Sequence, residues 1–333
     1  MAPASPALPP VPLDPAGLVR RVPLAPHERT ARITPQSDLF VLAHFGIARV
    51  DPAAWQLEIG GLVARPQRFG LAEFRRLPRC RVQSFHQCAG FPRRADIATR
   101  RVGNVVWGGV DLQALLEEAG VAPEARFLHA YGLDHGTYDG ESARHYAKDI
   151  PLARLAEGGV LLADEINGET LTAEHGFPLR LVVPGYYGTN TVKWLCRLEL
   201  APERAESPFT TVLYNDPLPG GGTRPVWEAP PEALIVAPAP GALPGRGPIE
   251  IWGWAWGASA VTRVEVSRDG GESWDPAALE PRTQWSWQRF SLAWTPAASG
   301  PATLMARASD AAGRTQPPAN ARNAIHAVSV VVP

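Results

Sequence analysis

Proline is the residue that most limits what this chain can fold into. The 333 residues include 35 prolines, whereas average usage is about 5%. Because proline breaks helix interiors but is tolerated in turns and at strand ends, this content favours strands, turns and rigid loops over long helices. The length is sufficient for two domains, each with its own core.

Hydrophobic patterning indicates a mixed first part of the chain. Period-two alternation predicts strands at 55–63 and 80–88. A short helix is expected at 70–78, and a longer one at 110–121, where apolar residues recur at helical spacing and Gly120 supplies the C-terminal cap. Further strand-like runs lie at 125–134, 159–168, 177–185 and 191–202. We therefore expect an α+β domain in which strands exceed helices.

The amino-acid composition changes near residues 215–247, which are rich in proline, glycine and alanine. The GGG run at 220–222 opens no helix after a strand, so we interpret it as linker. Evenly spaced strands with Asp-Gly turns follow, the pattern of a β-sandwich of about 100 residues. The predicted parts are an extended arm at 1–35, a mixed domain at 36–225 and an immunoglobulin-like sandwich at 226–333.

Charge and hydropathy exclude some classes of function. The net charge of −1 and the ordinary charged content argue against a nucleic-acid partner. No apolar run approaches the roughly 18–20 residues that span a bilayer, so no membrane span is expected. The N-terminus lacks the charged start and apolar core of a secretory signal. The given sequence therefore predicts a cytoplasmic protein, but a periplasmic protein from which the signal had been removed would have the same features.

The three cysteines, Cys80, Cys88 and Cys196, form no CxxC pair. This spacing predicts no disulfide framework, no zinc site and no attached c-type haem. A strand-linked glycine fingerprint for NAD is also missing. We therefore expect neither haem nor NAD as a cofactor.

Cys88 stands in a distinctive setting. Ser84, His86 and Cys88 fall on one face of the predicted strand, which then turns through Ala89-Gly90 toward Arg93-Arg94. Nearby guanidinium groups favour the thiolate, the form of cysteine that binds metals or attacks substrates. Taken alone, the motif also fits a simple buried cysteine.

Several separated motifs carry a stronger signal. QCAG followed by RR, VVWGGVDLQALLEEAG, HGFPLR and TVKWL occur in this order. From about Leu39 to Tyr214 the chain resembles the sulfite oxidase family of molybdenum enzymes, and the sandwich resembles that family's dimerisation domain. The resemblance implies an α+β, β-rich molybdopterin-binding domain of sulfite-oxidase type followed by an immunoglobulin-like β-sandwich. It also implies a cofactor of molybdenum and molybdopterin, and a homodimer.

The resemblance extends to single residues. Cys88 matches the cysteine whose thiolate binds molybdenum. The other matched cofactor-binding positions are His44, His175, Arg180 and Lys193. Trp107 and Tyr214 match aromatic residues of the substrate pocket, and Tyr214 is expected to be catalytic. Either Arg93 or Arg94 matches a pocket arginine; an extra residue in this loop leaves the choice between them open.

Other residues have plainer interpretations. Lys148 is expected to be a surface charge, and His86 a solvated or hydrogen-bonded histidine without a function. The tryptophans of IWGWAWG at 251–257 are expected either to fill the sandwich core or to form a subunit interface. In the second case the chain pairs with another copy; in the first it is a monomer.

The match weakens on the substrate side. Sulfite-oxidising members of the family carry an arginine where this chain has Leu42, and an acid is usual where it has Leu213. Three hypotheses therefore stay open. The first is oxidation of sulfite or a related small sulfur compound or oxyanion, with electrons passed to a separate acceptor such as a c-type cytochrome. The second is reduction of a sulfoxide or of an N- or S-oxide. The third is a cofactor-free binding scaffold.

Overall fold

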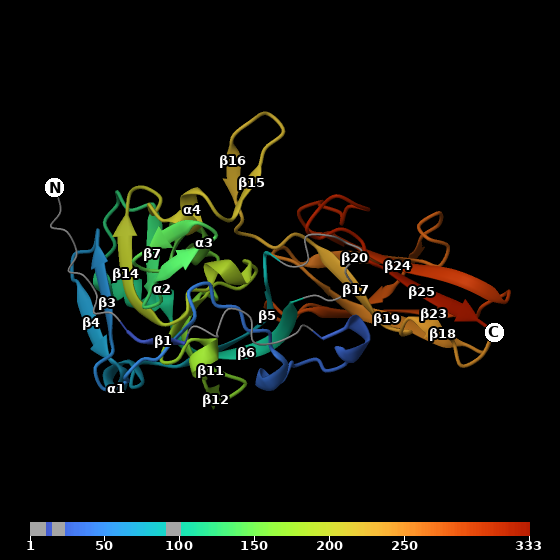
Figure 1. The fold of residues 1–333 in the computed structure, drawn as a ribbon, viewed down its shortest axis with the longest axis horizontal. Helices are drawn as coiled ribbons and strands as arrows, with labels where there is room; N and C mark the ends of the chain where they lie inside the picture. Colours follow the sequence, from blue (N-terminus) through green and yellow to red (C-terminus); the bar gives the residue numbers. More distant parts are fainter. Residues whose placement is uncertain (1–10, 15–23, 91–100) are drawn as a thin grey trace.

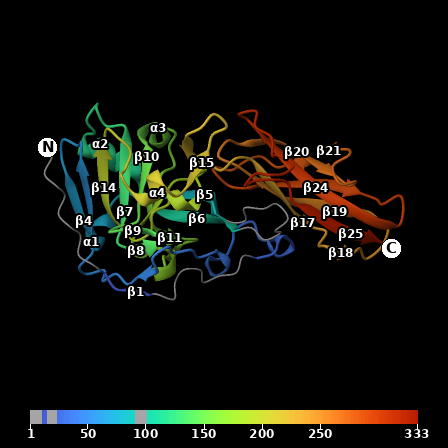
Figure 2. The ribbon, with the colours of Figure 1, turned by 45° about the horizontal axis from the view of Figure 1, so that its top comes forward.

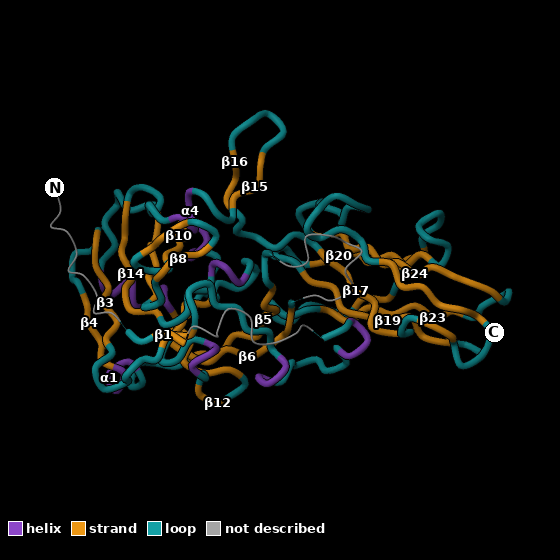
Figure 3. The backbone as a smooth tube through the Cα atoms, in the orientation of Figure 1, coloured by secondary structure: helices purple, strands orange, loops and turns teal. Residues whose placement is uncertain are grey.

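The computed structural model describes residues 11–14, 24–90 and 101–333. These residues form two lobes that lie end to end, with the N-terminal lobe at the left and the C-terminal lobe at the right of Figure 1. Strands dominate both lobes, and the helices are short (Figure 3). This agrees with the β-rich architecture predicted from the proline content. No helix in the described ranges has the length and apolarity to cross a membrane.

The first lobe is built on a five-stranded sheet in the order β10-β7-β14-β3-β4. Its strands are β3 (Gln56–Gly61), β4 (Gln67–Gly70), β7 (Phe127–Gly132), β10 (Ala147–Pro151) and β14 (Leu195–Ala201). All neighbouring pairs are antiparallel except β14 and β3, which run parallel. The fully buried side chains of Leu57, Leu128 and Leu198 place the main core of this lobe against the sheet.

A second sheet of the first lobe has the order β12-β11-β6-β5, with β13 paired to β11. Its strands are β5 (Cys80–Gln87), β6 (Val102–Asp111), β11 (Leu161–Ile166), β12 (Glu169–Thr170) and β13 (Arg180–Val182). Its pairs are antiparallel. The sheet carries β5 and β13 toward the same region of the lobe. The cysteine motif and the HGFPLR motif are therefore brought together.

Helices and short strands complete the first lobe. The α-helices are α1 (Leu71–Phe74), α2 (Leu112–Ala119), α3 (Leu152–Ala156) and α4 (Pro208–Thr211). The 3-10 turns are Gln36–Asp38, Ala173–His175 and Gly188–Asn190, and the small strands are β1 (Leu13–Asp14), β2 (Ile47–Ala48), β8 (Gly136–Tyr138) and β9 (Glu141–Ala143). A further 3-10 turn, Pro26–Glu28, packs against β17 (Glu232–Ala237) of the second lobe. α2 begins where the Asp111 carboxylate accepts from the amides of Gln113 and Ala114, and ends at Gly120 with φ 71°.

A hairpin projects from the junction of the lobes, at the top of Figure 1. It consists of β15 (Asn215–Pro217) and β16 (Thr223–Pro225). Gly221 and Gly222 have φ of 90° and 76°, conformations that suit glycine. The glycines interpreted as linker therefore form the turn of a hairpin at the junction of the lobes.

The second lobe is a sandwich of two sheets in the orders β17-β19-β23-β22 and β18-β25-β24-β20-β21. The first sheet contains β17 (Glu232–Ala237), β19 (Ile249–Trp256), β22 (Ala278–Leu279) and β23 (Gln288–Trp294). The second contains β18 (Gly241–Ala242), β20 (Val261–Ser267), β21 (Asp275–Pro276), β24 (Gly300–Asp310) and β25 (Ala327–Val332). Ile251, Val264 and Leu304 are buried in the core of this lobe.

Tryptophans of the second lobe lie where the two lobes meet. Trp254, Trp256 and Trp287 are buried in one cluster with Phe85 and Tyr187 of the first lobe. Their indole N–H groups donate to the Arg29 carbonyl at 2.7 Å, the Gln87 side chain at 2.9 Å and the Arg32 carbonyl at 2.9 Å, respectively. These three rings therefore join the lobes of one chain, an arrangement that neither sequence interpretation anticipated.

Candidate active site

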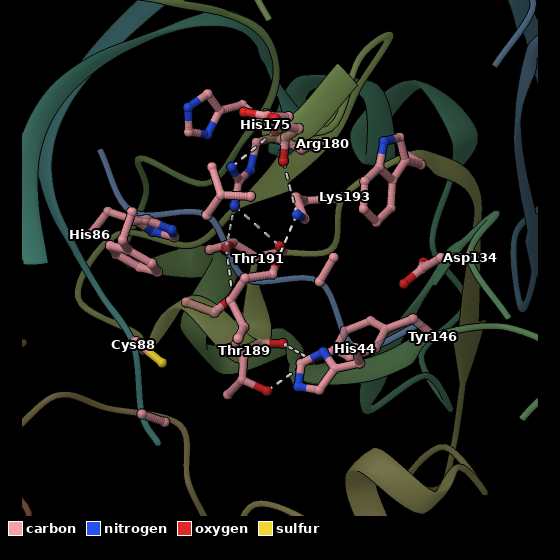
Figure 4. Close-up of a pocket in the computed structure, with 18 of the residues that line it drawn as sticks. His44, His86, Cys88, Asp134, Tyr146, His175, Arg180, Thr189, Thr191 and Lys193 are labelled. Carbon is pink, nitrogen blue, oxygen red and sulfur yellow. Dashed lines mark hydrogen bonds between the residues drawn. The ribbon is translucent and has the colours of Figure 1, made fainter. Parts of the chain in front are cut away.

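One pocket gathers most of the residues singled out from the sequence (Figure 4). Its walls come mainly from segments 40–44, 86–89, 174–175 and 188–194, with Tyr214 closing one side. These segments belong to different parts of the first lobe and to the turns that follow its strands. The pocket exists only because the two sheets bring these ends together.

Cys88 lies in the pocket just beyond the end of β5. The Cys88 amide donates to the Arg101 carbonyl at 2.9 Å. The preceding Gln87 side chain is held by the second lobe, because it donates to Glu232 at 2.6 Å and accepts from the Trp256 indole. The cysteine is therefore presented by a strand end that both lobes fix in place.

The cationic wall of the pocket contains Arg180 at the start of β13. Its guanidinium is 3% exposed and donates to the His175 carbonyl at 3.0 Å and to the Thr191 hydroxyl at 2.9 Å. Its Nε makes no hydrogen bond to any described residue. Burial lowers the pKa of Arg180 to about 9, which still leaves it charged at neutral pH.

Lys193 extends the cationic wall. Its Nζ donates to the carbonyls of Leu42 and Glu174, each at 2.9 Å. Gly176 makes room for the lysine, since a Cβ at Gly176 would lie 2.9 Å from the Lys193 Cβ. Burial and the neighbouring Arg180 charge lower the pKa of Lys193. A bound anion would offset both costs.

Asp134 is the buried acid of the pocket. It follows β7 and is 3% exposed, and burial raises the pKa of its carboxyl group. Its Oδ1 accepts no hydrogen bond from any described residue. A buried carboxylate oxygen without a donor is costly, so the geometry leaves room for a ligand that donates hydrogen bonds.

His44 and Tyr214 face each other on the opposite side of the pocket. The His44 Nε2 lies 2.6 Å from the Tyr214 hydroxyl, and the imidazole packs against Tyr138, Tyr146 and Phe209. Burial and the charges of Lys193 and Lys148 lower the pKa of His44 to about 3. The imidazole is therefore neutral at physiological pH and can exchange one hydrogen bond with the phenol.

The residues predicted from the sequence are only partly brought together. Cys88, His44, His175, Arg180, Lys193 and Tyr214 all line the pocket. Trp107 does not: its side chain is fully buried behind Arg180, whose guanidinium lies 4.8 Å from the ring centroid. The indole N–H donates to the Ser84 hydroxyl at 3.1 Å, so the tryptophan supports the wall instead of forming it. Arg93 and Arg94 lie outside the described residues.

Among the lining residues that sequence reasoning missed are His86 and Asp134. His86 lies in the pocket wall, stacked on Phe40 with ring centroids 5.1 Å apart. The alternation that placed His86 and Cys88 on one strand face was the signal that could have found it. Asp134 carries no such signal, because it sits in a loop far from every recognised motif.

Known proteins similar to this chain share this organisation. The model of the oxidoreductase molybdopterin-binding domain matches residues 44–209, and that of the Mo-co oxidoreductase dimerisation domain matches residues 224–331. Sulfite oxidase of Gallus gallus is 30% identical over 318 residues, which cover 86% of this chain and 68% of the relative. This chain belongs to the sulfite oxidase family.

Two further known proteins are similar to this chain over most of its length. The mitochondrial sulfite oxidase of Homo sapiens is 31% identical over 315 residues, covering 86% of this chain and 57% of that protein. The chain therefore covers 68% of the length of the Gallus gallus protein and 57% of the length of the Homo sapiens protein. The sulfane dehydrogenase SoxCD from Paracoccus pantotrophus superposes with a TM-score of 0.80 at 32% identity, over 91% of this chain and 82% of that one.

The pocket fits the molybdopterin cofactor of the sulfite oxidase family. Cys88 offers a soft thiolate ligand for molybdenum. Arg180 and Lys193 form no ion pair with a carboxylate among the described residues, so an anionic phosphate would satisfy them. The Arg180 Nε and Asp134 Oδ1, which lack partners among the same residues, would suit the polar edges of a pterin.

Proposed function

We propose that this chain is a molybdenum-dependent oxidoreductase that oxidises a small sulfur compound, sulfite being the first candidate, and passes the electrons to a separate acceptor. The observation that carries this proposal is the pocket itself, in which the Cys88 thiol faces the cations of Arg180 and Lys193, neither of them paired with a carboxylate of the described chain. A cofactor-free scaffold would gain nothing from burying these charges.

The chain's own residues have separate roles. With the cofactor bound, Cys88 would bind the metal, His175, Arg180 and Lys193 would hold the phosphate, and Asp134 would accept a hydrogen bond from the pterin. When bound, the cofactor would supply two-electron chemistry in which an oxygen atom derived from water is added to the substrate and the two electrons pass to the separate acceptor. Tyr214 binds the substrate through its hydroxyl, whose other hydrogen bond to the neutral His44 fixes its direction.

The second lobe contributes an arginine to a cavity beside the pocket. A neighbouring cavity shares Ala89 and Tyr214 with the pocket and is also lined by Arg322. Arg322 is held by two hydrogen bonds to Asp216, at 2.9 and 2.8 Å. Because Asp216 balances the charge of Arg322, the proposed role of attracting an anionic substrate falls to Arg93 or Arg94.

Leu42 decides which sulfur compound fits best. It lines the pocket and offers no hydrogen bond from its side chain. Loss of one charge-assisted hydrogen bond weakens binding of an oxyanion by roughly 10- to 100-fold. A sulfane sulfur, the group for which the structural neighbour SoxCD is named a sulfane dehydrogenase, carries less charge at the reacting atom and tolerates this change better. The same feature favours reduction of a neutral sulfoxide or of an N- or S-oxide as the second candidate.

We propose a c-type cytochrome as the separate electron acceptor. We also propose that the sandwich pairs two chains into a homodimer, since it matches the dimerisation domain. Light scattering on the purified, metal-loaded protein tests the second point. A mass near twice the chain mass of 35.8 kDa supports the homodimer, and a mass near 35.8 kDa contradicts it.

Molybdenum content and turnover test the proposal together. Wild type, Cys88→Ser and the matched control Cys80→Ser are produced in a host that makes the cofactor. Each is assayed with sulfite and with thiosulfate, using cytochrome c or ferricyanide as acceptor. We expect about one molybdenum per chain and turnover in wild type and Cys80→Ser, and lost turnover in Cys88→Ser. Metal without turnover of either compound favours the reductase, and absence of metal from the wild type favours the scaffold.

A further inference from the structure

Lys148 is fully buried, so the prediction that it is a surface charge is wrong. It lies in β10, opposite Ala130 of β7. The chain has only two lysines among its 32 lysine and arginine residues. One is Lys193 of the pocket wall, and the other, Lys148, lies behind Tyr214. Burying an ammonium is costly, so its contacts need an explanation.

The Lys148 ammonium completes the end of α4, the helix that leads to Tyr214. Its Nζ donates to the Phe209 carbonyl at 2.7 Å. Within the helix this carbonyl would accept from the Leu213 amide, but that amide donates to the Pro208 carbonyl at 2.7 Å instead. Lys148 therefore supplies the donor that the helix end lacks. α4 and β10 lie side by side, as the turned view shows (Figure 2).

The turn held in this way has an unusual backbone. Tyr214 has φ 59°, in the left-handed region that non-glycine residues rarely adopt. The side-chain amide of Asn215 donates to the carbonyls of Thr210 at 3.0 Å and Leu213 at 3.2 Å, which fixes the other side of the turn. Such a conformation persists only when its surroundings enforce it.

Lys148 also contacts the tyrosine ring directly. Its Nζ lies 5.6 Å from the centroid of the Tyr214 ring, close enough for an attraction between the cation and the ring. The acidic neighbour Asp149 is fully buried and is paired with Arg204, so Lys148 forms no ion pair with a carboxylate among the described residues. The positive charge is thus directed at the helix end and the phenol.

We propose that Lys148 is a positioning residue for Tyr214: its ammonium holds the α4 turn and the face of the phenol, so that the hydroxyl stays directed at the substrate. The proposal rests on the function proposed above for Tyr214. Burial lowers the pKa of Lys148 to about 7. A partial loss of charge near neutral pH would weaken the attraction to the ring, while the neutral amine would still donate to the Phe209 carbonyl.

A double-mutant cycle tests the proposal on the metal-loaded enzyme. The variants are Lys148→Met, Tyr214→Phe and the double variant, with Arg126→Gln as the control that removes an exposed charge at the edge of the same sheet. We expect Lys148→Met to lower kcat about tenfold or more with KM nearly unchanged, because a small misplacement of a reacting group costs rate. In the Tyr214→Phe background the same substitution should change kcat less than about twofold, while Arg126→Gln should retain wild-type kcat.

The outcomes separate the two proposals. Unchanged kcat in Tyr214→Phe overturns the role of Tyr214 itself. Two results overturn the role of Lys148 alone. In the first, Tyr214→Phe lowers kcat but Lys148→Met retains the wild-type kcat. In the second, the two kcat losses multiply in the double variant. If Lys148→Met does not fold, Asn215→Ala is the replacement, because it loosens the same turn. A kcat loss in Asn215→Ala that disappears in the Tyr214→Phe background supports the proposal. An unchanged kcat in Asn215→Ala contradicts it.

Discussion

The Nε2 atom of His44 lies 2.6 Å from the hydroxyl oxygen of Tyr214, although 170 positions separate the two residues in the sequence. His44 comes from the segment that enters the first lobe, and Tyr214 from the turn after α4. Because the imidazole is neutral and enclosed by aromatic rings, the hydrogen bond gives the phenol one fixed direction.

Tyr214→Phe should slow turnover without removing the metal. The variant loses the hydroxyl that we propose contacts the substrate, and a hydrogen bond of this kind to a charged group accounts for roughly 10- to 100-fold in kcat/KM. Tyr138→Phe is the control, because Tyr138 packs edge-on against His44 at 4.7 Å without a hydrogen bond to it. Steady-state kinetics alongside molybdenum analysis checks this, and equal losses in the two variants would argue against a direct role.

Leu42→Arg should improve the use of sulfite. The substitution places a guanidinium on the pocket wall, where it can pair with the oxyanion. We expect KM for sulfite to fall by roughly 10- to 100-fold, with a smaller change for thiosulfate. Leu42→Met, which adds length without charge, is the control. A similar gain with Leu42→Met would assign the effect to shape.

Arg180→Met should yield folded protein that retains little cofactor. The guanidinium is buried without a carboxylate partner among the described residues, and its proposed counter-charge is the cofactor phosphate. Fluorescence of the released, oxidised pterin measures retention independently of activity. Arg81→Gln, a change at an exposed position of β5, should retain wild-type amounts. Full retention in Arg180→Met would contradict the assigned role.

Acid should destabilise the cofactor-free protein through His44. Its pKa is 6.5 in the unfolded chain and about 3 in the folded one. Between these values the unfolded chain binds a proton that the folded chain does not, so the free energy of unfolding falls as pH falls. The loss attributable to His44 is roughly 2 kcal/mol between pH 6.5 and about pH 5.

Urea unfolding at these two pH values checks the acid effect, with His44→Gln as the comparison. The pH dependence should be smaller in the variant, which has no imidazole to protonate. His86 titrates in the same direction, since burial also lowers its pKa, and it leaves a residual dependence in both proteins. An identical dependence in wild type and His44→Gln would exclude His44 as a source.

Trp287→Ala should loosen the contact between the lobes. The ring is 2% exposed, and it stacks on Trp254 with centroids 4.8 Å apart. Deleting a buried aromatic side chain of this kind costs about 3–5 kcal/mol. Trp252→Ala removes a partly buried ring of the same sheet and should cost less. Chemical unfolding followed by circular dichroism measures the free energy of unfolding of both variants. An equal loss in the two would indicate that Trp287 contributes no more to stability than Trp252.

Much of the fold follows from local sequence patterns. The strand expected at 80–88 is β5, and the helix expected at 110–121 is α2 with Gly120 at its end. Alternation and helical spacing report which face of an element is buried, and capping residues report where it stops. The motif order also anticipated that Cys88, Arg180 and Lys193 share one pocket.

Burial of single polar residues was decided only by the tertiary structure. A lysine is usually exposed, yet Lys148 lies beneath Tyr214 with no exposed surface. Asp134 carries no motif, and Trp107 lies behind Arg180 although its motif suggested the pocket. Sequence patterns record the period of a strand or helix. Which distant elements cover a given side chain depends on how the sheets pack, and packing joins residues that no local pattern connects.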